Sequence, residues 1–123
     1  MTSPTATSDK AAIGAAMERL AESFLVAQGW RVLARNHRCR FGEVDLIVRD
    51  DAVLVFVEVR FRRSVQFGGA AASVDRRKQR RLIAAAQDYL QTHPLPLPCR
   101  FDVVAISSQH EINWIQHAFV IEN

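Results

Sequence analysis

Two stretches decide the fold of this chain: Gly42-Glu43-Val44-Asp45-Leu46-Ile47 and Val55-Phe56-Val57-Glu58-Val59-Arg60. Their β-branched and aromatic residues are typical of buried strands, so the acidic side chains within them require an explanation. An ionised carboxylate is costly to bury unless it is paired or binds a metal ion. Asp45 and Glu58 are therefore the first candidates for a functional site.

The two stretches are predicted to pair as a β-hairpin, with strands at residues 41–49 and 52–62 and a turn at Asp50-Asp51. Pairing near this turn places Asp45 beside Glu58 on one face, because side chains alternate with a period of two. Adjacent carboxylates repel each other unless a cation lies between them, and Mg²⁺ accepts such ligands together with water and substrate phosphate. The alternative is an ordinary ion-pair network with neighbouring arginines, and spacing alone leaves both open.

The rest of the chain divides into helices and strands by the period of its apolar residues. Helices are predicted at residues 9–28 and 73–92, after a disordered tail at residues 1–8. Further strands are predicted at residues 31–35, 99–106 and 112–121, with a basic loop at 38–40. Residues 9–123 are thus predicted to form a single α/β domain of order α-β-β-β-α-β-β, a mixed β-sheet flanked by helices.

Composition narrows the class of protein. The chain has 123 residues, of which 49% are hydrophobic and 24% charged, as in an ordinary soluble domain. No apolar run approaches the roughly 20 residues that a membrane span needs, so no membrane partner is expected. The two cysteines, Cys39 and Cys99, are isolated in the sequence. They favour a reduced, cytoplasmic protein over a disulfide scaffold.

Positive charge is concentrated in residues 35–81, which carry 12 basic and 6 acidic residues, although the whole chain has a net charge of only +3. Such an excess favours a polyanionic partner such as nucleic acid; a solvated charged face is the alternative. No base-reading module is present, so recognition of structure or backbone is expected. The candidate backbone contacts are seven basic residues: Arg62, Arg63, Arg76, Arg77, Lys78, Arg80 and Arg81.

Several motifs occur in the order typical of a known bacterial family: Ala21-Glu22, Arg35-Asn36, the two stretches quoted above, Phe67-Gly68, Lys78, Arg100-Phe101-Asp102-Val103-Val104 and Ala118-Phe119. On these motifs the sequence resembles the YraN-like family, from about Ile13 to Phe119. That family is similar to archaeal Holliday junction resolvases and to the restriction-endonuclease-like superfamily, which has a PD-(D/E)XK nuclease core. The resemblance implies a restriction-endonuclease-like fold and a DNA endonuclease dependent on Mg²⁺ or Mn²⁺.

The resemblance also implies roles for individual residues. Asp45 corresponds to the metal-binding aspartate, and Glu58 to the acidic residue of the (D/E)XK tripeptide. Glu22 corresponds to the first-helix glutamate of resolvase-like members. The main-chain carbonyl of Val59 is implied as a further metal ligand.

Arg60 departs from the motif, which has lysine at this place. An arginine donates hydrogen bonds and carries charge, but it cannot accept a proton. Arg60 therefore suits electrostatic stabilisation only, and Lys78 on the second predicted helix is an alternative source of an amine. Loss of catalysis is the other interpretation of Arg60.

Three functions remain open at this point. The first is the endonuclease, for which a two-fold homodimer would supply the two active sites that a four-way junction needs. The second is a non-catalytic nucleic-acid-binding protein that keeps the fold and the basic face. The third is a metal-free interaction module in which Asp45 and Glu58 are salt-bridged to arginines.

Overall fold

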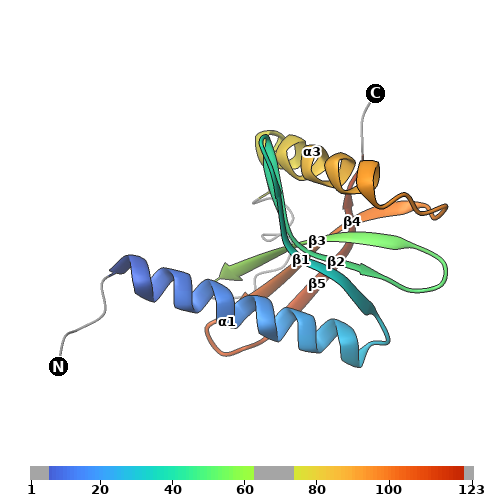
Figure 1. The fold of residues 1–123 in the computed structure, drawn as a ribbon. Helices are drawn as coiled ribbons and strands as arrows, with labels where there is room; N and C mark the ends of the chain where they lie inside the picture. Colours follow the sequence, from blue (N-terminus) through green and yellow to red (C-terminus); the bar gives the residue numbers. More distant parts are fainter. Residues whose placement is uncertain (1–5, 63–73, 121–123) are drawn as a thin grey trace.

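The computed structural model describes residues 6–62 and 74–120 (Figure 1). In this part of the chain the elements follow in the order α1 (Ala6–Ala27), β1 (Arg31–Cys39), β2 (Gly42–Arg49), β3 (Leu54–Arg62), α3 (Arg76–Thr92), β4 (Cys99–Ser107) and β5 (Ile112–Phe119). The predicted α/β class and the order α-β-β-β-α-β-β are confirmed.

The strands form one mixed sheet of five, in the spatial order β1-β2-β3-β4-β5. Only the pair β3–β4 is parallel; the pairs β1–β2, β2–β3 and β4–β5 are antiparallel. Because a parallel pair needs a long crossover, the chain passes through α3 between β3 and β4. Figure 1 shows α1 on one face of the sheet and α3 on the other, so the central strands are covered on both sides.

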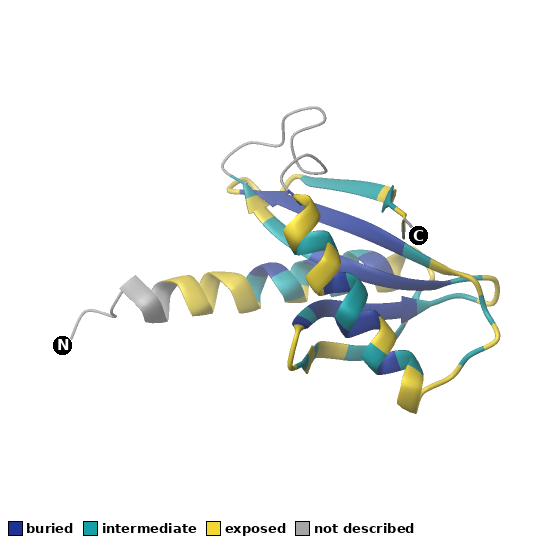
Figure 2. Ribbon diagram, turned by 90° about the horizontal axis from the view of Figure 1, so that it is seen from above, coloured by how far each residue is buried: buried dark blue, intermediate teal, exposed yellow. Residues whose placement is uncertain are grey.

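Strand β3 is buried on both faces, which explains its nearly continuous apolar sequence. Leu54 and Phe56 pack in the core on the α3 side, whereas Val55 and Val57 pack in the core on the α1 side. Figure 2 shows buried residues concentrated along the strands. By the same alternation, the side chain of Glu58, two residues after Phe56, is directed to the α3 side of the sheet.

Helix α1 begins at Ala6, so residues 6–8, predicted as part of a disordered tail, are helical. Residues 1–5 lie outside the described part. The helix packs on the sheet through Met17, Ala21 and Leu25, whereas residues 10–15 are exposed (Figure 2). Gly29, with a φ of 99°, follows its end, as is common for the left-handed residue after a helix. Neither described helix has the length and apolar character to cross a membrane.

Strand β1 is longer than predicted. It extends to Cys39 and pairs with β2 as far as Gly42, so Arg38 lies in a strand and the predicted basic loop at 38–40 is wrong in most of its length. Only Arg40 and Phe41 remain as the turn. The period-two pattern of β1 is weak in the sequence because this edge strand is largely exposed.

The β1–β2 ladder is irregular next to Asp45. Asn36 lies opposite Asp45, between the pairs Arg35–Leu46 and His37–Val44, and has a positive φ of 50°. Across this point Val44 packs in the α3-side core and Leu46 in the α1-side core, although they are two residues apart. The regular alternation of side chains expected along β2 is thus interrupted at Asp45, a predicted site residue. Irregular backbone of this kind is often found at functional positions.

Helix α3 begins at Arg76, after Asp75, whose side chain accepts a hydrogen bond from the Lys78 N–H at 2.8 Å. This is an ordinary N-cap, and the predicted start at residue 73 is not described. The buried side of α3 is formed by Leu82, Ala85, Ala86 and Tyr89.

The start of β2 lies very close to α3. A Cβ added to Gly42 would lie 2.0 Å from the carbonyl oxygen of Arg81, so glycine is required for this approach. Figure 1 shows the β1–β2 turn beside the first turns of α3. The contact positions the basic N-terminal half of α3 against β2.

Candidate active site

Asp45 and Glu58 are brought together by the β2–β3 hairpin. The pairs from Leu46–Val57 to Arg49–Leu54 set the register, and the next position places Asp45 opposite Glu58. Their exposed fractions are only 7% and 5%, and their carboxyl groups are hydrogen-bonded to each other. The hairpin prediction from the sequence thus gave the correct neighbours.

The carboxyl group of Asp45 is held on both sides. Its Oδ2 accepts a hydrogen bond from the Val59 N–H at 2.8 Å. Burial, together with the charge of Glu58, raises the pKa of Asp45 to about 8, although the Val59 N–H opposes the shift. Near neutral pH the metal-free pair therefore keeps a proton, which a cation binding there would replace.

Two basic side chains approach the same oxygen of Glu58. Arg60 Nε lies 3.1 Å and Lys78 Nζ lies 3.5 Å from Glu58 Oε2. Arg60 comes from the same strand, whereas Lys78 reaches across from α3. Arg60 Nε is buried and makes no hydrogen bond of good geometry with the described residues. It is therefore a donor that a substrate oxygen could satisfy.

The donor set can be tested against a divalent cation. Among the described residues, no group of three or more His, Cys, Asp or Glu side chains is arranged to hold a metal ion. A metal here would depend on two carboxylates, a main-chain carbonyl and water. Mg²⁺ is commonly bound by one or two carboxylates and retains several waters, so the pair fits this ion, and Val59 is adjacent to Glu58 on the same strand.

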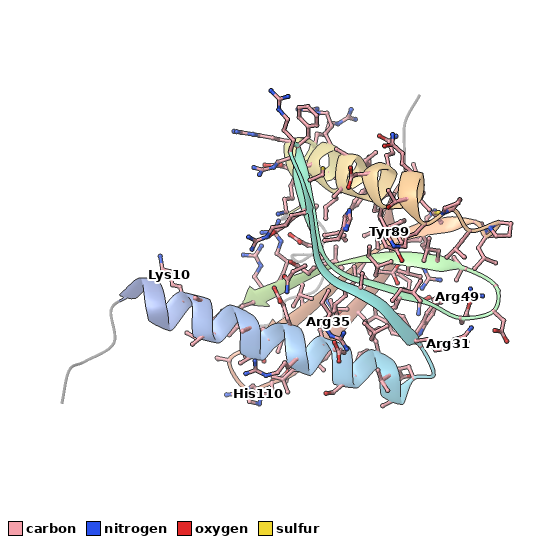
Figure 3. All side chains as sticks on the ribbon, viewed as in Figure 1. Lys10, Arg31, Arg35, Arg49, Tyr89 and His110 are labelled. Carbon is pink, nitrogen blue, oxygen red and sulfur yellow. The ribbon has the colours of Figure 1, made fainter. Side chains whose placement is uncertain are left out.

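Glu22, predicted as a catalytic residue, is paired with Arg35 of β1. Its carboxylate accepts hydrogen bonds from Nε and Nη2 of Arg35, the latter at 3.0 Å, and this bond lowers its pKa. Figure 3 shows Arg35 beside α1. Another acidic residue of α1, Glu18, interacts electrostatically with Asp45: its pKa is raised first by burial and then by the charge of Asp45.

Glu18 also accepts a hydrogen bond from Asn36, the residue opposite Asp45. Glu18 and Glu22 both line a hollow of about 340 Å³ between α1 and the β1–β2 hairpin. The sequence gives only their spacing of four residues, which places both on one helical face. It carries no signal for the rotation of α1 against the sheet, and motif comparison alone therefore selected Glu22.

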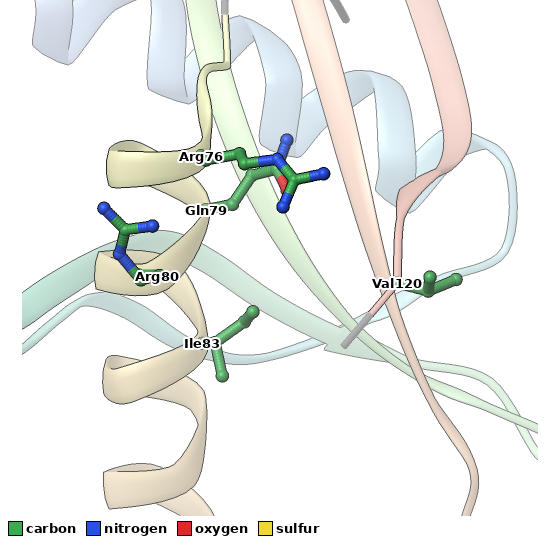
Figure 4. Close-up of a pocket in the computed structure, with 5 residues that line it drawn as sticks. All are labelled: Arg76, Gln79, Arg80, Ile83 and Val120. Atoms are coloured by element: carbon green, nitrogen blue, oxygen red, sulfur yellow. The ribbon is translucent and has the colours of Figure 1, made fainter. Parts of the chain in front are cut away.

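Four of the predicted basic contacts, all on α3, line two separate hollows. Arg76 and Arg80 line one of about 160 Å³ together with Gln79, Ile83 and Val120 (Figure 4). Lys78 and Arg81 line another on the β2 side.

Three further predicted contacts lie elsewhere. Arg77 is exposed on α3, and Arg62 is partly buried at the end of β3. Arg63 lies outside the described residues. Among the described members of this set, Lys78 contacts the carboxylate pair, and the set does not line one common hollow.

A family model matches residues 17–106, which include the carboxylate pair and Lys78; its description is "Uncharacterised protein family UPF0102". A UPF0102 protein of Ralstonia nicotianae is 57% identical over 117 residues, which cover 91% of this chain and 89% of that protein. A UPF0102 protein of Nitrosomonas europaea is 53% identical over 108 residues, covering 86% of this chain and 92% of that protein. A third, of Saccharophagus degradans, is 53% identical over 110 residues, with coverages of 88% and 92%.

Proposed function

This chain belongs to the UPF0102 family of bacterial proteins, and from the chemistry of its buried carboxylate pair we propose that it is a Mg²⁺- or Mn²⁺-dependent DNA endonuclease. The motif-based prediction of a YraN-like family member is confirmed at the level of the family. The relation to restriction-endonuclease-like enzymes and to Holliday junction resolvases belongs to the proposal.

One observation carries the proposal. Two nearly buried carboxyl groups, Asp45 and Glu58, lie side by side, and a lysine ammonium is 3.5 Å from one of them. Burial of such a pair is unfavourable unless a proton or a cation neutralises part of its charge. A carboxylate pair with an adjacent cation is an arrangement that suits phosphodiester hydrolysis, because it can hold a divalent ion and a phosphate together.

Asp45, Glu58 and the carbonyl of Val59 are the groups that would hold the ion. When bound, the ion would lower the pKa of a water and neutralise charge on the scissile phosphate. The N–H of Val59 fixes the orientation of Asp45. The metal-free pair holds a proton because the pKa of Asp45 is raised to about 8, so metal binding below that pH releases it.

The two basic groups at Glu58 differ in what they can do. Arg60 offers a buried N–H donor, which can stabilise charge on a phosphate oxygen but cannot accept a proton. Lys78 carries a primary amine, which can exchange a proton and is near the same carboxylate oxygen. We propose that Lys78 supplies the function of the motif lysine and that Arg60 binds the phosphate.

The partner proposed is DNA, bound through its backbone. Basic side chains of β3 and α3 contact the pair, and further basic residues of β1 and α3 line a hollow that shares Lys78 with it. No described element resembles a base-reading module. A homodimer would present two such sites to a branched substrate. The proposal places the protein in the reducing cytoplasm, with which its two free cysteines agree.

The test is cleavage of linear, flapped and four-way DNA in Mg²⁺ or Mn²⁺. Asp45→Asn and Glu58→Gln should abolish cleavage, and Lys78→Gln should reduce it more than Arg60→Lys does. Asp51→Asn is the matched control, because Asp51 is fully exposed in the hairpin turn. Mn²⁺ binding, followed by electron paramagnetic resonance, should be lost in Asp45→Asn independently of activity. Full activity of Asp45→Asn would exclude the proposed mechanism.

A non-catalytic nucleic-acid-binding protein is the second candidate, and one observation favours it. Glu58 already has two basic partners, Arg60 and Lys78, and the described residues contain no three-carboxylate or mixed metal group. Under this alternative the native protein binds DNA equally well with and without divalent ions and never cleaves it.

A further inference from the structure

The turn between β1 and β2 presents an exposed aromatic ring. Phe41 has an exposed fraction of 67%, the largest among the exposed large hydrophobic residues of the described part. The guanidinium of Arg40 lies 5.4 Å from the centre of its ring. The turn contains only Arg40 and Phe41, since Cys39 already pairs with Gly42. The ring therefore lies in the two-residue turn at the tip of the β1–β2 hairpin and contributes little to the core.

The hairpin tip lies between two hollows. The first, of about 300 Å³, is lined by Arg38, Arg40, Glu43, Lys78 and Arg81. The second, of about 290 Å³, is lined by Arg40, Phe41, Gln87, Asp88 and Gln91. Both volumes are close to the lower limit of about 300 Å³ that is typical of small-ligand sites.

The first hollow is suited to phosphate. Four of its side chains are basic, and its single acid, Glu43, is paired with Arg38 at 2.6 Å. Lys78 belongs both to this hollow and to the carboxylate site, because its Nζ is 3.5 Å from Glu58. A phosphate held here is therefore next to the groups proposed to cleave DNA.

The second hollow is suited to a nucleobase. Gln87 and Gln91 are four residues apart on α3, so their amides face the same side, and each offers both a donor and an acceptor. Phe41 supplies the stacking surface beside them. A base inside a duplex is stacked and cannot enter such a hollow, whereas an unpaired base can.

We propose that the β1–β2 hairpin tip binds an unpaired nucleotide of DNA, with its base stacked on Phe41 beside Gln87 and Gln91 and its phosphates held by Arg40 and Arg81. This inference rests on the proposed function and names its substrate class: DNA that has an unpaired nucleotide next to the scissile phosphate. A basic groove combined with an exposed aromatic ring is the usual chemistry of single-strand binding.

The position of the tip is fixed relative to the site. The contact of Gly42 with the carbonyl of Arg81 allows the hairpin to lie directly against α3. The stacking surface and the phosphate-binding groups are thus held together before DNA binds, which lowers the entropic cost of binding.

The experiment measures binding in EDTA, so that cleavage plays no part. Fluorescence anisotropy compares a blunt duplex with the same duplex carrying one unpaired 2-aminopurine, whose own fluorescence reports stacking. The native protein should prefer the unpaired substrate by about tenfold, as expected for one base stacked on an aromatic side chain. Phe41→Ala should remove this preference and the fluorescence quenching, while Phe41→Trp should retain both.

Phe61→Ala is the matched control, because Phe61 is also exposed, with a fraction of 42%, but lies on β3. It should leave the preference unchanged. Equal affinity of the native protein for both substrates would overturn the inference, and so would a preference that persists in Phe41→Ala or an absence of DNA binding. The binding assay contains no metal and is therefore independent of cleavage. A protein that prefers the unpaired substrate in EDTA but does not cleave DNA with Mg²⁺ or Mn²⁺ would refute the proposed activity and leave this inference intact.

Discussion

Asp45→Asn should make the stability of this protein less sensitive to pH. In the folded, metal-free protein the pKa of Asp45 is raised from 3.8 to about 8, first by burial and then by Glu58. Between these two values the folded state keeps a proton that the unfolded state has lost. The unfolded state thus binds fewer protons, and the free energy of unfolding falls as pH rises from about 4 to about 8.

The size of the effect follows from the proton difference. A difference of one proton changes the free energy of unfolding by about 1.4 kcal/mol per pH unit. From pH 5 to pH 7 the native protein should therefore lose up to about 3 kcal/mol relative to Asp45→Asn. The amide of the variant keeps an acceptor for the Val59 N–H and does not ionise, so this contribution disappears from its pH profile.

The assay is urea denaturation in EDTA at several pH values from about 5 to 8, followed by circular dichroism. The Asp51→Asn variant removes a fully exposed carboxylate from the hairpin turn, and its profile should match that of the native protein. Parallel profiles for the native protein and Asp45→Asn would refute the reasoning, because they would mean that Asp45 is already ionised. Added Mg²⁺ should stabilise the native protein more at pH 8 than at pH 6, since below pH 8 it must displace the proton.

Two further substitutions test the packing around the site. Gly42→Ala should lower the free energy of unfolding by about 1–3 kcal/mol in urea denaturation, because its Cβ would lie 2.0 Å from the Arg81 oxygen. Gly14→Ala is its control: its Cβ meets nothing within 4 Å, and it should stabilise the helix by about 0.5–1 kcal/mol. Asp102→Ala should cost about 3–5 kcal/mol, because Asp102 is buried and accepts two hydrogen bonds from Arg100, both at 2.8 Å. Thermal unfolding measures this loss, and an unchanged midpoint would contradict a structural role for the pair.

The parts of the fold that the sequence predicts well are those whose pattern is set by burial. The prediction is correct for strands β2 and β3 because both faces of β3 are buried and a tight turn at Asp50 fixes the register. In this turn the Asp50 side chain accepts hydrogen bonds from the Ala52 and Val53 N–H groups, both at 2.8 Å. The proximity of Asp45 and Glu58 follows from that register alone. The length of β1 does not, because an exposed edge strand has no strict apolar alternation.

Two features of the site depend on tertiary packing and could not be predicted from the sequence. Which glutamate of α1 faces Asp45 depends on the rotation of the helix against the sheet, and that rotation is set by how Met17, Ala21 and Leu25 pack. The irregular position of Asn36, with its positive φ, likewise depends on tertiary contacts. Local sequence patterns contain neither the helix rotation nor the φ angle, so they do not predict the charge interaction between Glu18 and Asp45.

The position of Lys78 connects this packing to the proposed chemistry. Arg60 is fixed by its place on β3, but Lys78 reaches Glu58 from a separate element, so its distance from the carboxylate depends on how closely α3 approaches β2. That approach is possible because Gly42 has no side chain. A larger residue at position 42 would displace α3 and separate the amine from the pair while leaving Asp45, Glu58 and Arg60 in place. Gly42→Ala should therefore reduce DNA cleavage more than it reduces metal binding. If Arg60 alone were sufficient for cleavage, Gly42→Ala would keep both cleavage and metal binding.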